Sequence, residues 1–209
     1  MPLREIMSAA GEAATDTAVE KLGKNVLDDK IELPDDSGER KYSLDLPDDS
    51  GERMPAKVSA NNDKGDLRAS SKYELNNYRY ETDAQGRISH VHGNLRLEEA
   101  DRDLNAQRKV GKEGGDTGYD GGHIIASQFG GDGGIGNLIP MKSDLNRAGG
   151  GYYKMEQELK CALKEGHTVK LDVKMTYQGD SKVPSKIVAT YEISGTVSKR
   201  VFDNIGGSK

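Results

Sequence analysis

The sequence has one cysteine and no tryptophan among its 209 residues, and only 33% of them are hydrophobic. Because Cys161 is alone, no disulfide can form within the chain, which indicates a reducing compartment or an export route that does not depend on oxidative folding. No apolar run approaches the roughly 20 residues that a membrane helix needs. The beginning of the sequence also lacks a basic segment followed by an apolar stretch, so no signal peptide is predicted.

Acidic residues outnumber basic ones, 35 to 30, and their distribution along the chain matters more than the net charge. The net charge is −5, which at first argues against a nucleic-acid partner, because phosphate binding needs Lys and Arg. Residues 1–70 contain 10 Lys and Arg against 16 Asp and Glu, whereas residues 71–209 contain 20 against 19. The acidity therefore lies in the N-terminal part, and the remainder is compatible with a local basic patch that binds a polyanion.

Two short stretches carry the chemistry. Residues 120–126 read Asp-Gly-Gly-His-Ile-Ile-Ala, and residues 137–146 read Asn-Leu-Ile-Pro-Met-Lys-Ser-Asp-Leu-Asn. His123 can take a proton from water near neutral pH, since its unperturbed pKa is about 6.5. The Asn146 carbonyl is a neutral oxygen ligand for a hard cation such as Mg²⁺. Together they permit metal-assisted hydrolysis of a phosphodiester.

These stretches resemble the active site of the DNA/RNA non-specific endonucleases, a family of the ββα-metal superfamily. The resemblance is strongest to the branch found as toxic C-terminal domains of secreted bacterial polymorphic toxins, and it covers roughly residues 78–204. It implies that His123 is the general base and Asn146 the metal ligand, with Mg²⁺ as cofactor and Mn²⁺ as a substitute. It also implies that Glu156, an acidic residue on the following helix, is a second metal ligand and orients metal-bound water.

Substrate contacts are expected from residues beside these two stretches. The glycines carry no side chain, so a phosphate backbone could approach the histidine closely. The candidate substrate-binding residues are Asp120, Gly121, Gly122, Asn137 and Lys142.

The sequence departs from the family pattern at Gly121, where many members have arginine. A guanidinium that stabilises the transition state must then come from elsewhere, and Arg108 and Arg147 are the candidates. The interval between Asn146 and Glu156 is also longer than in the arginine-bearing branch, and three glycines at 149–151 account for the difference.

The predicted fold class is α+β, an antiparallel sheet with a ββα-metal finger, over a domain of residues 73–204. Alternation of apolar and polar residues predicts a hairpin of 78–82 with 87–91 and a terminal pair of strands, 168–177 with 186–193. A strand over 119–129 would hold His123 at its middle, and helices are expected within 97–110 and over 152–165. Residues 205–209 are predicted to fray.

His90 and His92 lie on one face of the second hairpin strand, two residues apart. Such a pair could bind a metal ion, but no Cys or Asp lies near it in the sequence. A solvent-facing position is therefore expected.

Residues 1–72 are predicted to be an acidic segment outside the catalytic domain. Apolar residues at helical spacing predict a marginal helix over 4–27. The sequence Leu-Pro-Asp-Asp-Ser-Gly-Glu-Arg occurs at 33–40 and again at 46–53, and two copies are too few for a solenoid. Its composition is typical of turns, which favours a flexible linker. The alternative is an acidic surface that imitates phosphate and occupies the nuclease groove before delivery.

Two functions of different classes remain open from the sequence. The first is a sequence-non-specific, Mg²⁺-dependent endonuclease acting on DNA, with RNA as a second candidate substrate. The resemblance then implies a secreted antibacterial toxin with no signal peptide of its own, delivered into the target-cell cytoplasm and neutralised by an immunity protein, with no membrane partner. The second is a nucleic-acid-binding or protein-binding module with weak or no catalysis, which Gly121 in place of arginine favours.

The cationic cluster at 108–112 is equally open to two interpretations. It is either a phosphate contact or a solvated helix end.

Overall fold

The computed structural model describes residues 61, 65–115 and 118–205. The predicted helix at 4–27, the two copies of the repeat and residues 206–209 of the predicted tail lie outside the described residues.

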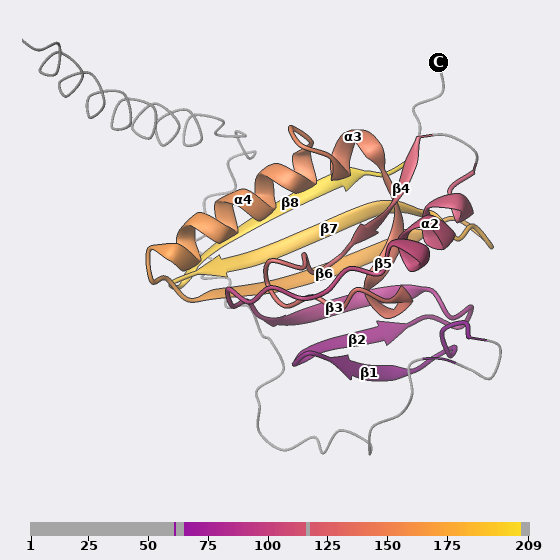
Figure 1. Ribbon diagram of the computed structural model, residues 1–209, viewed down its shortest axis with the longest axis horizontal. Helices are drawn as coiled ribbons and strands as arrows, with labels where there is room; N and C mark the ends of the chain where they lie inside the picture. The colour runs from indigo at the N-terminus through magenta and orange to yellow at the C-terminus, as the bar shows by residue number, and fades with distance from the viewer. Residues whose placement is uncertain (1–60, 62–64, 116–117, 206–209) are drawn as a thin grey trace, which may run out of the picture. The chain divides into compact units, whose positions relative to one another are not determined.

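A six-stranded antiparallel sheet forms the larger layer of the domain (Figure 1). Its strands, in spatial order, are β1 (Lys72–Leu75), β2 (Tyr78–Thr82), β3 (Ile88–Asn94), β6 (Val169–Tyr177), β7 (Pro184–Ile193) and β8 (Thr196–Asp203). Apolar residues alternate with polar ones along β6, so every second side chain is buried and the others face away from the core. The turn between β2 and β3 is closed by Asp83, whose carboxylate accepts hydrogen bonds from the backbone N–H groups of Gln85 and Arg87.

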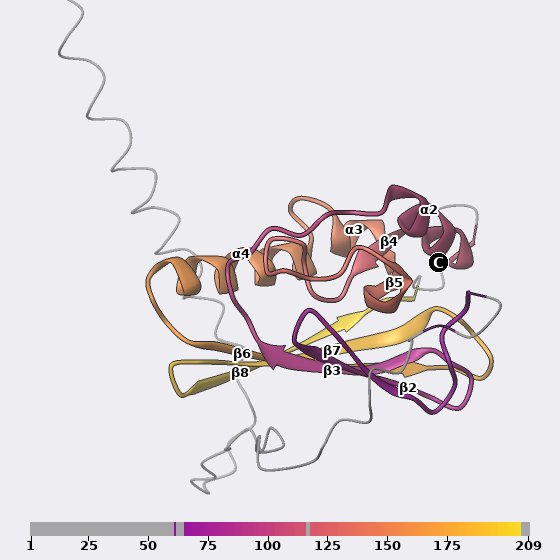
Figure 2. The same ribbon diagram turned by 60° about the horizontal axis from the view of Figure 1, so that its bottom comes forward.

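The second layer contains the helices and a two-stranded sheet, which cover one face of the larger sheet (Figure 2). Its elements are α2 (Leu104–Glu113), β4 (Tyr119–His123), the 3₁₀ turn η1 (Ile135–Asn137), β5 (Leu138–Lys142), α3 (Ser143–Asn146) and α4 (Gly151–Lys164). The hydrophobic core lies between the layers and joins Leu159 of α4 to Val91 and Val173 of the sheet. This packing fixes the β4–β5–α3 unit on the sheet.

Helix α4 is held by an apolar face at helical spacing. Tyr152, Met155, Leu159 and Ala162 are all buried. Full burial of a side chain such as Met155 or Leu159 contributes about 1.5–3 kcal/mol. The phenol of Tyr152 also meets the ring of Phe202 on β8 edge-on, at 5.3 Å between ring centroids. Helix α4 is therefore a firm support for any side chain that it presents to the site.

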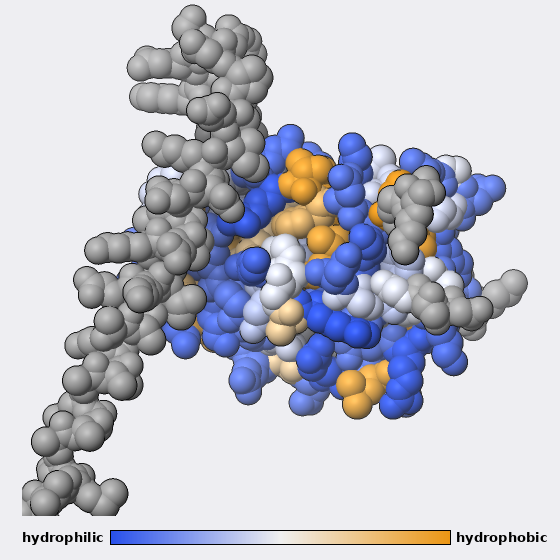
Figure 3. Space-filling model, turned by 90° about the horizontal axis from the view of Figure 1, so that it is seen from above, coloured by the Kyte–Doolittle hydropathy of each residue, from blue (hydrophilic) through white to orange (hydrophobic). Residues whose placement is uncertain are grey.

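Apolar side chains are concentrated in this core. On the face shown in Figure 3, hydrophilic side chains surround small, separate apolar patches. Among the residues that the structure describes, the exposed large hydrophobic side chains are those of Leu97, Leu104, Val201 and Ile205. No helix in the described part of the chain is long and apolar enough to cross a membrane.

The predicted α+β fold with a ββα finger is confirmed, as are the first hairpin and the pairing of β6 with β7. Three details differ. Strand β4 ends at His123, so the histidine is the last residue of the strand and not its middle. Helix α2 begins at Leu104, because the Asp103 carboxylate accepts from the backbone N–H groups of Asn105 and Ala106 and caps it there. Strands β1 and β8 were not predicted.

The predicted solvent-facing position of the two hairpin histidines is wrong. His92 is buried, at 8% relative exposure, and His90 is half-buried against Asp172 of the neighbouring strand β6. No sequence pattern indicates this contact, because the two strands are far apart along the chain.

Candidate active site

One β-hairpin and the helix that follows it position both residues of the predicted catalytic pair. Strands β4 and β5 are antiparallel, and their register places His123 opposite Leu138. The chain passes directly from β5 into α3, which carries Asn146 and contacts β4. His123 and Asn146 therefore come from the strand and the helix of a single finger.

Asp120 on β4 binds the two residues at the end of this finger. Its carboxylate accepts from Arg147 at 3.0 Å from Nε and 2.8 Å from Nη2, and from Asn146 Nδ2 at 3.2 Å. These hydrogen bonds, of which that from Arg147 has the largest effect, hold the pKa of Asp120 below its usual range. The Asp120 carboxylate therefore stays ionised. Since the amide nitrogen of Asn146 is committed to Asp120, its amide oxygen is the group left for a cation.

His123 is neutral at physiological pH. It is 6% exposed, and burial lowers the pKa of its imidazole to about 4, with a smaller effect from the charge of Arg102. The side-chain nitrogen of Gln107 lies 3.5 Å from Nδ1 of His123. The other ring nitrogen of His123, Nε2, is buried and has no hydrogen-bond partner among the described residues. An amide N–H can donate only to a ring nitrogen that lacks a proton. We therefore assign the proton to Nε2 and the basic lone pair to Nδ1.

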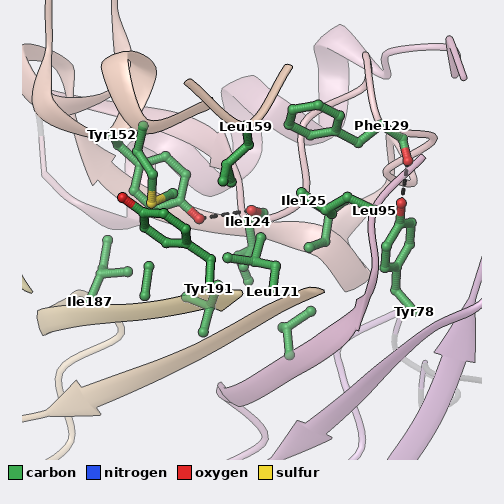
Figure 4. Packing of buried hydrophobic residues seen from close by; sticks show 14 of the residues in the cluster. Tyr78, Leu95, Ile124, Ile125, Phe129, Tyr152, Leu159, Leu171, Ile187 and Tyr191 are labelled. Carbon is green, nitrogen blue, oxygen red and sulfur yellow. Dashed lines mark hydrogen bonds between the residues drawn. The ribbon is translucent and has the colours of Figure 1, made fainter. Parts of the chain in front are cut away.

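Glu156 approaches the same region from α4. Tyr152, one helical turn before it, donates a hydrogen bond of 2.8 Å to the carbonyl of Ile124, the residue after His123 (Figure 4). Residues four apart share a face of a helix, so Glu156 lies on the face that meets the end of β4. Burial raises the pKa of its carboxyl to about 8, and the charge of Arg102 opposes this effect. A carboxyl in this state gains a proton or a cation.

The donor set fits a hard divalent cation. The Asn146 amide oxygen and the Glu156 carboxylate are oxygen ligands of the kind that Mg²⁺ prefers. The pKa of Glu156 is raised because the positive charge near it does not offset the cost of burying its carboxylate. A bound cation would supply the missing positive charge.

Comparisons with known proteins place this finger in a family. Residues 69–195 match the family model described as DNA/RNA non-specific endonuclease, which is more than half of the chain. The chain belongs to this family.

The chain is also similar to curated proteins and to solved structures. The type VII secretion system protein EssD of Staphylococcus aureus, in strains USA300, NCTC 8325 and Newman, is 38% identical over 135 residues. The match covers 62% of this chain and 22% of EssD, so the chain spans about a fifth of the length of these relatives. NucA from Streptococcus agalactiae, solved with no metal bound, superimposes with a TM-score of 0.48 at 17% identity, over 65% of this chain and 72% of NucA. Sda1 nuclease, solved with a bound zinc ion, superimposes with a TM-score of 0.49 at 17% identity, over 63% of this chain and 75% of Sda1.

The position where many of these endonucleases have arginine cannot hold a side chain here. A Cβ atom on Gly121 would lie 2.2 Å from the carbonyl oxygen of Gln107, and one on Gly111 would lie 2.9 Å from the backbone nitrogen of Gly121. A Cβ on Gly122 would lie 2.6 Å from that of Met141. Both β4 glycines are buried, so the close contact with α2 and β5 explains them better than the predicted approach of a phosphate.

The predicted substrate contact of Asn137 requires a correction. The residue is fully buried, and its amide nitrogen donates to the carbonyls of Ile125 and Asp132 at 2.8 Å each. Its amide oxygen accepts from the backbone N–H of Ile125 at 2.9 Å and from the hydroxyl of Tyr80 at 3.1 Å. All polar capacity of Asn137 is used within the protein. It fixes the loop between β4 and β5 and has no group free for a substrate.

The three predicted cationic residues occupy different positions. Arg147 is 70% exposed and is held at the finger by Asp120. Lys142 pairs with Asp144 at 3.1 Å next to it. Arg108 is exposed on α2 and donates to the side chain of Asn105 at 3.1 Å. Only Arg147 contacts a residue that also holds Asn146.

Two residues of the site had no sequence signal. Arg102, exposed just before α2, is the one cation whose charge lowers the pKa of both His123 and Glu156 among the described residues. Gln107 lies beside His123 and also donates to the carbonyl of Gly121 at 3.3 Å. Both reach the site because α2 packs on β4, which no local motif encodes.

Proposed function

We propose that this endonuclease hydrolyses DNA, and RNA as a second substrate, with a divalent cation and without sequence choice. The observation that carries the proposal is the neutral, buried imidazole of His123 at the end of the finger that holds Asn146. A general base must be unprotonated to act, and a pKa of about 4 keeps His123 in that form at physiological pH.

In this proposal Nδ1 of His123 takes the proton from an attacking water. The water oxygen forms a bond to phosphorus as the bond from phosphorus to the leaving oxygen breaks, and the imidazole holds the proton until it returns to solvent. The Gln107 amide, at 3.5 Å, is a weak partner that water can replace. Asp132 is the anion whose charge favours the protonated ring that then forms.

Asn146 and Glu156 would hold the cation. When bound, Mg²⁺ or Mn²⁺ would act as a Lewis acid towards the phosphate and the leaving oxygen. Asp120 would orient Asn146 through the 3.2 Å hydrogen bond, so it is a positioning residue and not a substrate contact. Its carboxylate would also repel a phosphate.

Arg102 is our candidate for the guanidinium missing at position 121. Its charge acts on both His123 and Glu156, so it lies where negative charge develops during phosphoryl transfer. Arg147, exposed and oriented by Asp120, would bind a neighbouring phosphate of the same strand. Contacts of this kind are to phosphate and carry no base sequence, which supports cleavage without sequence choice.

The biological role that we propose is that of a toxin domain. The support is the 38% identity to EssD, which is described as a type VII secretion system protein. A non-specific nuclease active in the cytosol would degrade the nucleic acid of the cell that makes it. We therefore propose export, action in the cytoplasm of a recipient cell, and a cognate immunity protein in the producer.

A plasmid-nicking assay with Mg²⁺ tests the catalytic assignment. His123→Ala should lower turnover by about 10²–10⁴-fold, the usual contribution of a general base. His167→Ala is the matched control, since His167 is exposed and pairs with Ser194 away from the finger. A His123→Ala variant that keeps more than roughly a tenth of wild-type turnover would exclude His123 as the base. DNA binding without cleavage by the wild type would favour the binding-module alternative.

A further inference from the structure

A second group of potential metal ligands lies on the other face of the larger sheet. His90 and His92 of β3 and Asp172 of β6 form it, and these strands are neighbours (Figure 1). The register pairs His92 with Asp172 and Val91 with Val173. Val91 and Val173 face the core below α4, so the alternate residues face away from it. The sheet therefore separates this group from His123.

The three side chains converge on one point. His90 Nε2 lies 2.6 Å from Asp172 Oδ2, and one ligand atom from each residue lies within 4.8 Å of the others. Two ligands of one tetrahedral Zn²⁺ lie roughly 3.3 Å apart, since each bond is about 2.0–2.2 Å long. The observed separations bracket this value, so small side-chain rotations suffice to form a site.

His92 supplies the independent evidence for a ligand. It is 8% exposed, and neither of its ring nitrogens has a hydrogen-bond partner among the described residues. A buried polar group without a partner costs about 1–3 kcal/mol, and each such group calls for an explanation.

A carboxylate also lies near the second ring nitrogen of His90. Glu81 Oε2 lies 4.0 Å from His90 Nδ1, on the side of the ring opposite the nitrogen that meets Asp172. Metal-bound histidines usually direct their other ring N–H to such a carboxylate, which fixes the tautomer and the ring orientation. The hydrogen bond to Asp172 accounts for His90 without a metal ion, but it leaves His92 unexplained.

We propose that His90, His92 and Asp172 bind a divalent transition-metal ion, Zn²⁺ in the first place, at a site separate from the catalytic centre. Two imidazoles and one carboxylate favour Zn²⁺ over Mg²⁺, which prefers oxygen ligands and retains most of its water. Because the ligands come from two paired strands, the ion would clamp β3 to β6 and stabilise the sheet.

Metal binding to the full-length, EDTA-treated protein tests the proposal directly. Co²⁺ serves as the spectroscopic probe and Zn²⁺ as the probe for stoichiometry and melting temperature. Asp172→Asn preserves the shape of the side chain but removes the charge, and His90→Ala removes a ligand that is only half-buried. Both variants should lose Co²⁺ absorption and the Zn²⁺-induced rise in melting temperature, while retaining Mg²⁺-dependent nuclease activity. Glu81→Gln should weaken Zn²⁺ binding by about 10–100-fold.

Two control variants separate this site from others. His167→Ala, an exposed histidine elsewhere, should bind the probes as the wild type does. Asn146→Ala, at the proposed catalytic centre, should keep one Zn²⁺ per chain that Asp172→Asn then removes. Zn²⁺ binding that survives both Asp172→Asn and His90→Ala overturns the proposal. Binding that disappears in Asn146→Ala alone would place the ion at the catalytic centre and overturns it equally.

Discussion

Glu156 should make the stability of this protein depend on pH and on divalent cations in opposite directions. The pKa of its half-buried carboxyl is raised from the ordinary 4.5 to about 8 by burial. Between these two values the folded protein keeps a proton that the unfolded chain releases. The folded state is therefore favoured fully below about pH 4.5, and this advantage is lost as the pH rises through about 8.

The magnitude follows from the size of the shift. A change of pKa from 4.5 to about 8 corresponds to at most about 5 kcal/mol, because each pKa unit is worth roughly 1.4 kcal/mol. Water penetration and side-chain relaxation around a half-buried group reduce this, so we expect about 1–3 kcal/mol. Glu156→Gln removes the titration. Relative to the wild type, it should gain that amount in unfolding free energy between about pH 5 and pH 9 in EDTA.

A bound cation should abolish this difference, because it stabilises the Glu156 carboxylate in the folded state only. Urea denaturation followed by circular dichroism, at several pH values, measures it. At a Mg²⁺ concentration about 100 times the dissociation constant, the wild type should gain about 2.7 kcal/mol, and Glu156→Gln much less. Glu165→Gln, at the exposed end of the same helix, is the control and should behave as the wild type. If Glu156→Gln and the wild type show parallel pH dependence in EDTA, the carboxyl is not desolvated. If Mg²⁺ stabilises both equally, Glu156 is not a ligand.

Three further changes test other parts of the structure. Gly121→Ala should lower the unfolding free energy by about 1–3 kcal/mol in urea, because its Cβ would overlap the backbone of α2; an unchanged midpoint would contradict the close packing of α2 on β4. Arg102→Ala should lower kcat by about 10²-fold or more, and it should move the acid limb of the pH–rate profile upward, because Arg102 lowers the pKa of His123. Arg108→Ala, the exposed control on α2, should do neither. Deletion of residues 1–60 should leave a domain that is folded by circular dichroism. Because the deletion removes 8 Lys and Arg and 14 Asp and Glu, the truncated chain should bind DNA more tightly at low salt. The gain in affinity should fade as added salt screens the charges. An unfolded product would show that the removed segment belongs to the domain.

Much of the fold could be predicted because its elements carry strong local patterns. Strands β6 and β7 have one face in the core and one outside, so their side chains alternate in hydropathy, and α4 buries an apolar stripe. Strand β8 lies at the edge of the sheet, where most of its side chains are at least partly exposed and only Phe202 is buried. Little alternation survives in such a strand, and its sequence resembles that of a loop.

The candidate site could be predicted only where residues that meet in space also belong to one sequence motif. His123 and Asn146 belong to one finger, so their separation along the chain reflects their proximity in space. The same motif contains Asn137, whose amide is used entirely for the loop between β4 and β5, and the sequence does not distinguish a structural amide from a ligand. The contact of His90 with Asp172 depends on the register of two strands that are distant in the sequence, so no local pattern predicts it.

The missing arginine and the packing of α2 have a common physical cause. Gly111 on α2 and Gly121 on β4 bring the two backbones so close that neither position accepts a Cβ atom. That contact excludes an arginine from position 121, and it also places Gln107 beside His123. Arg102 precedes the same helix and brings a guanidinium charge to act on both His123 and Glu156. In our proposal, Arg102 supplies the guanidinium that Gly121 cannot, so glycine at position 121 does not by itself argue against catalysis.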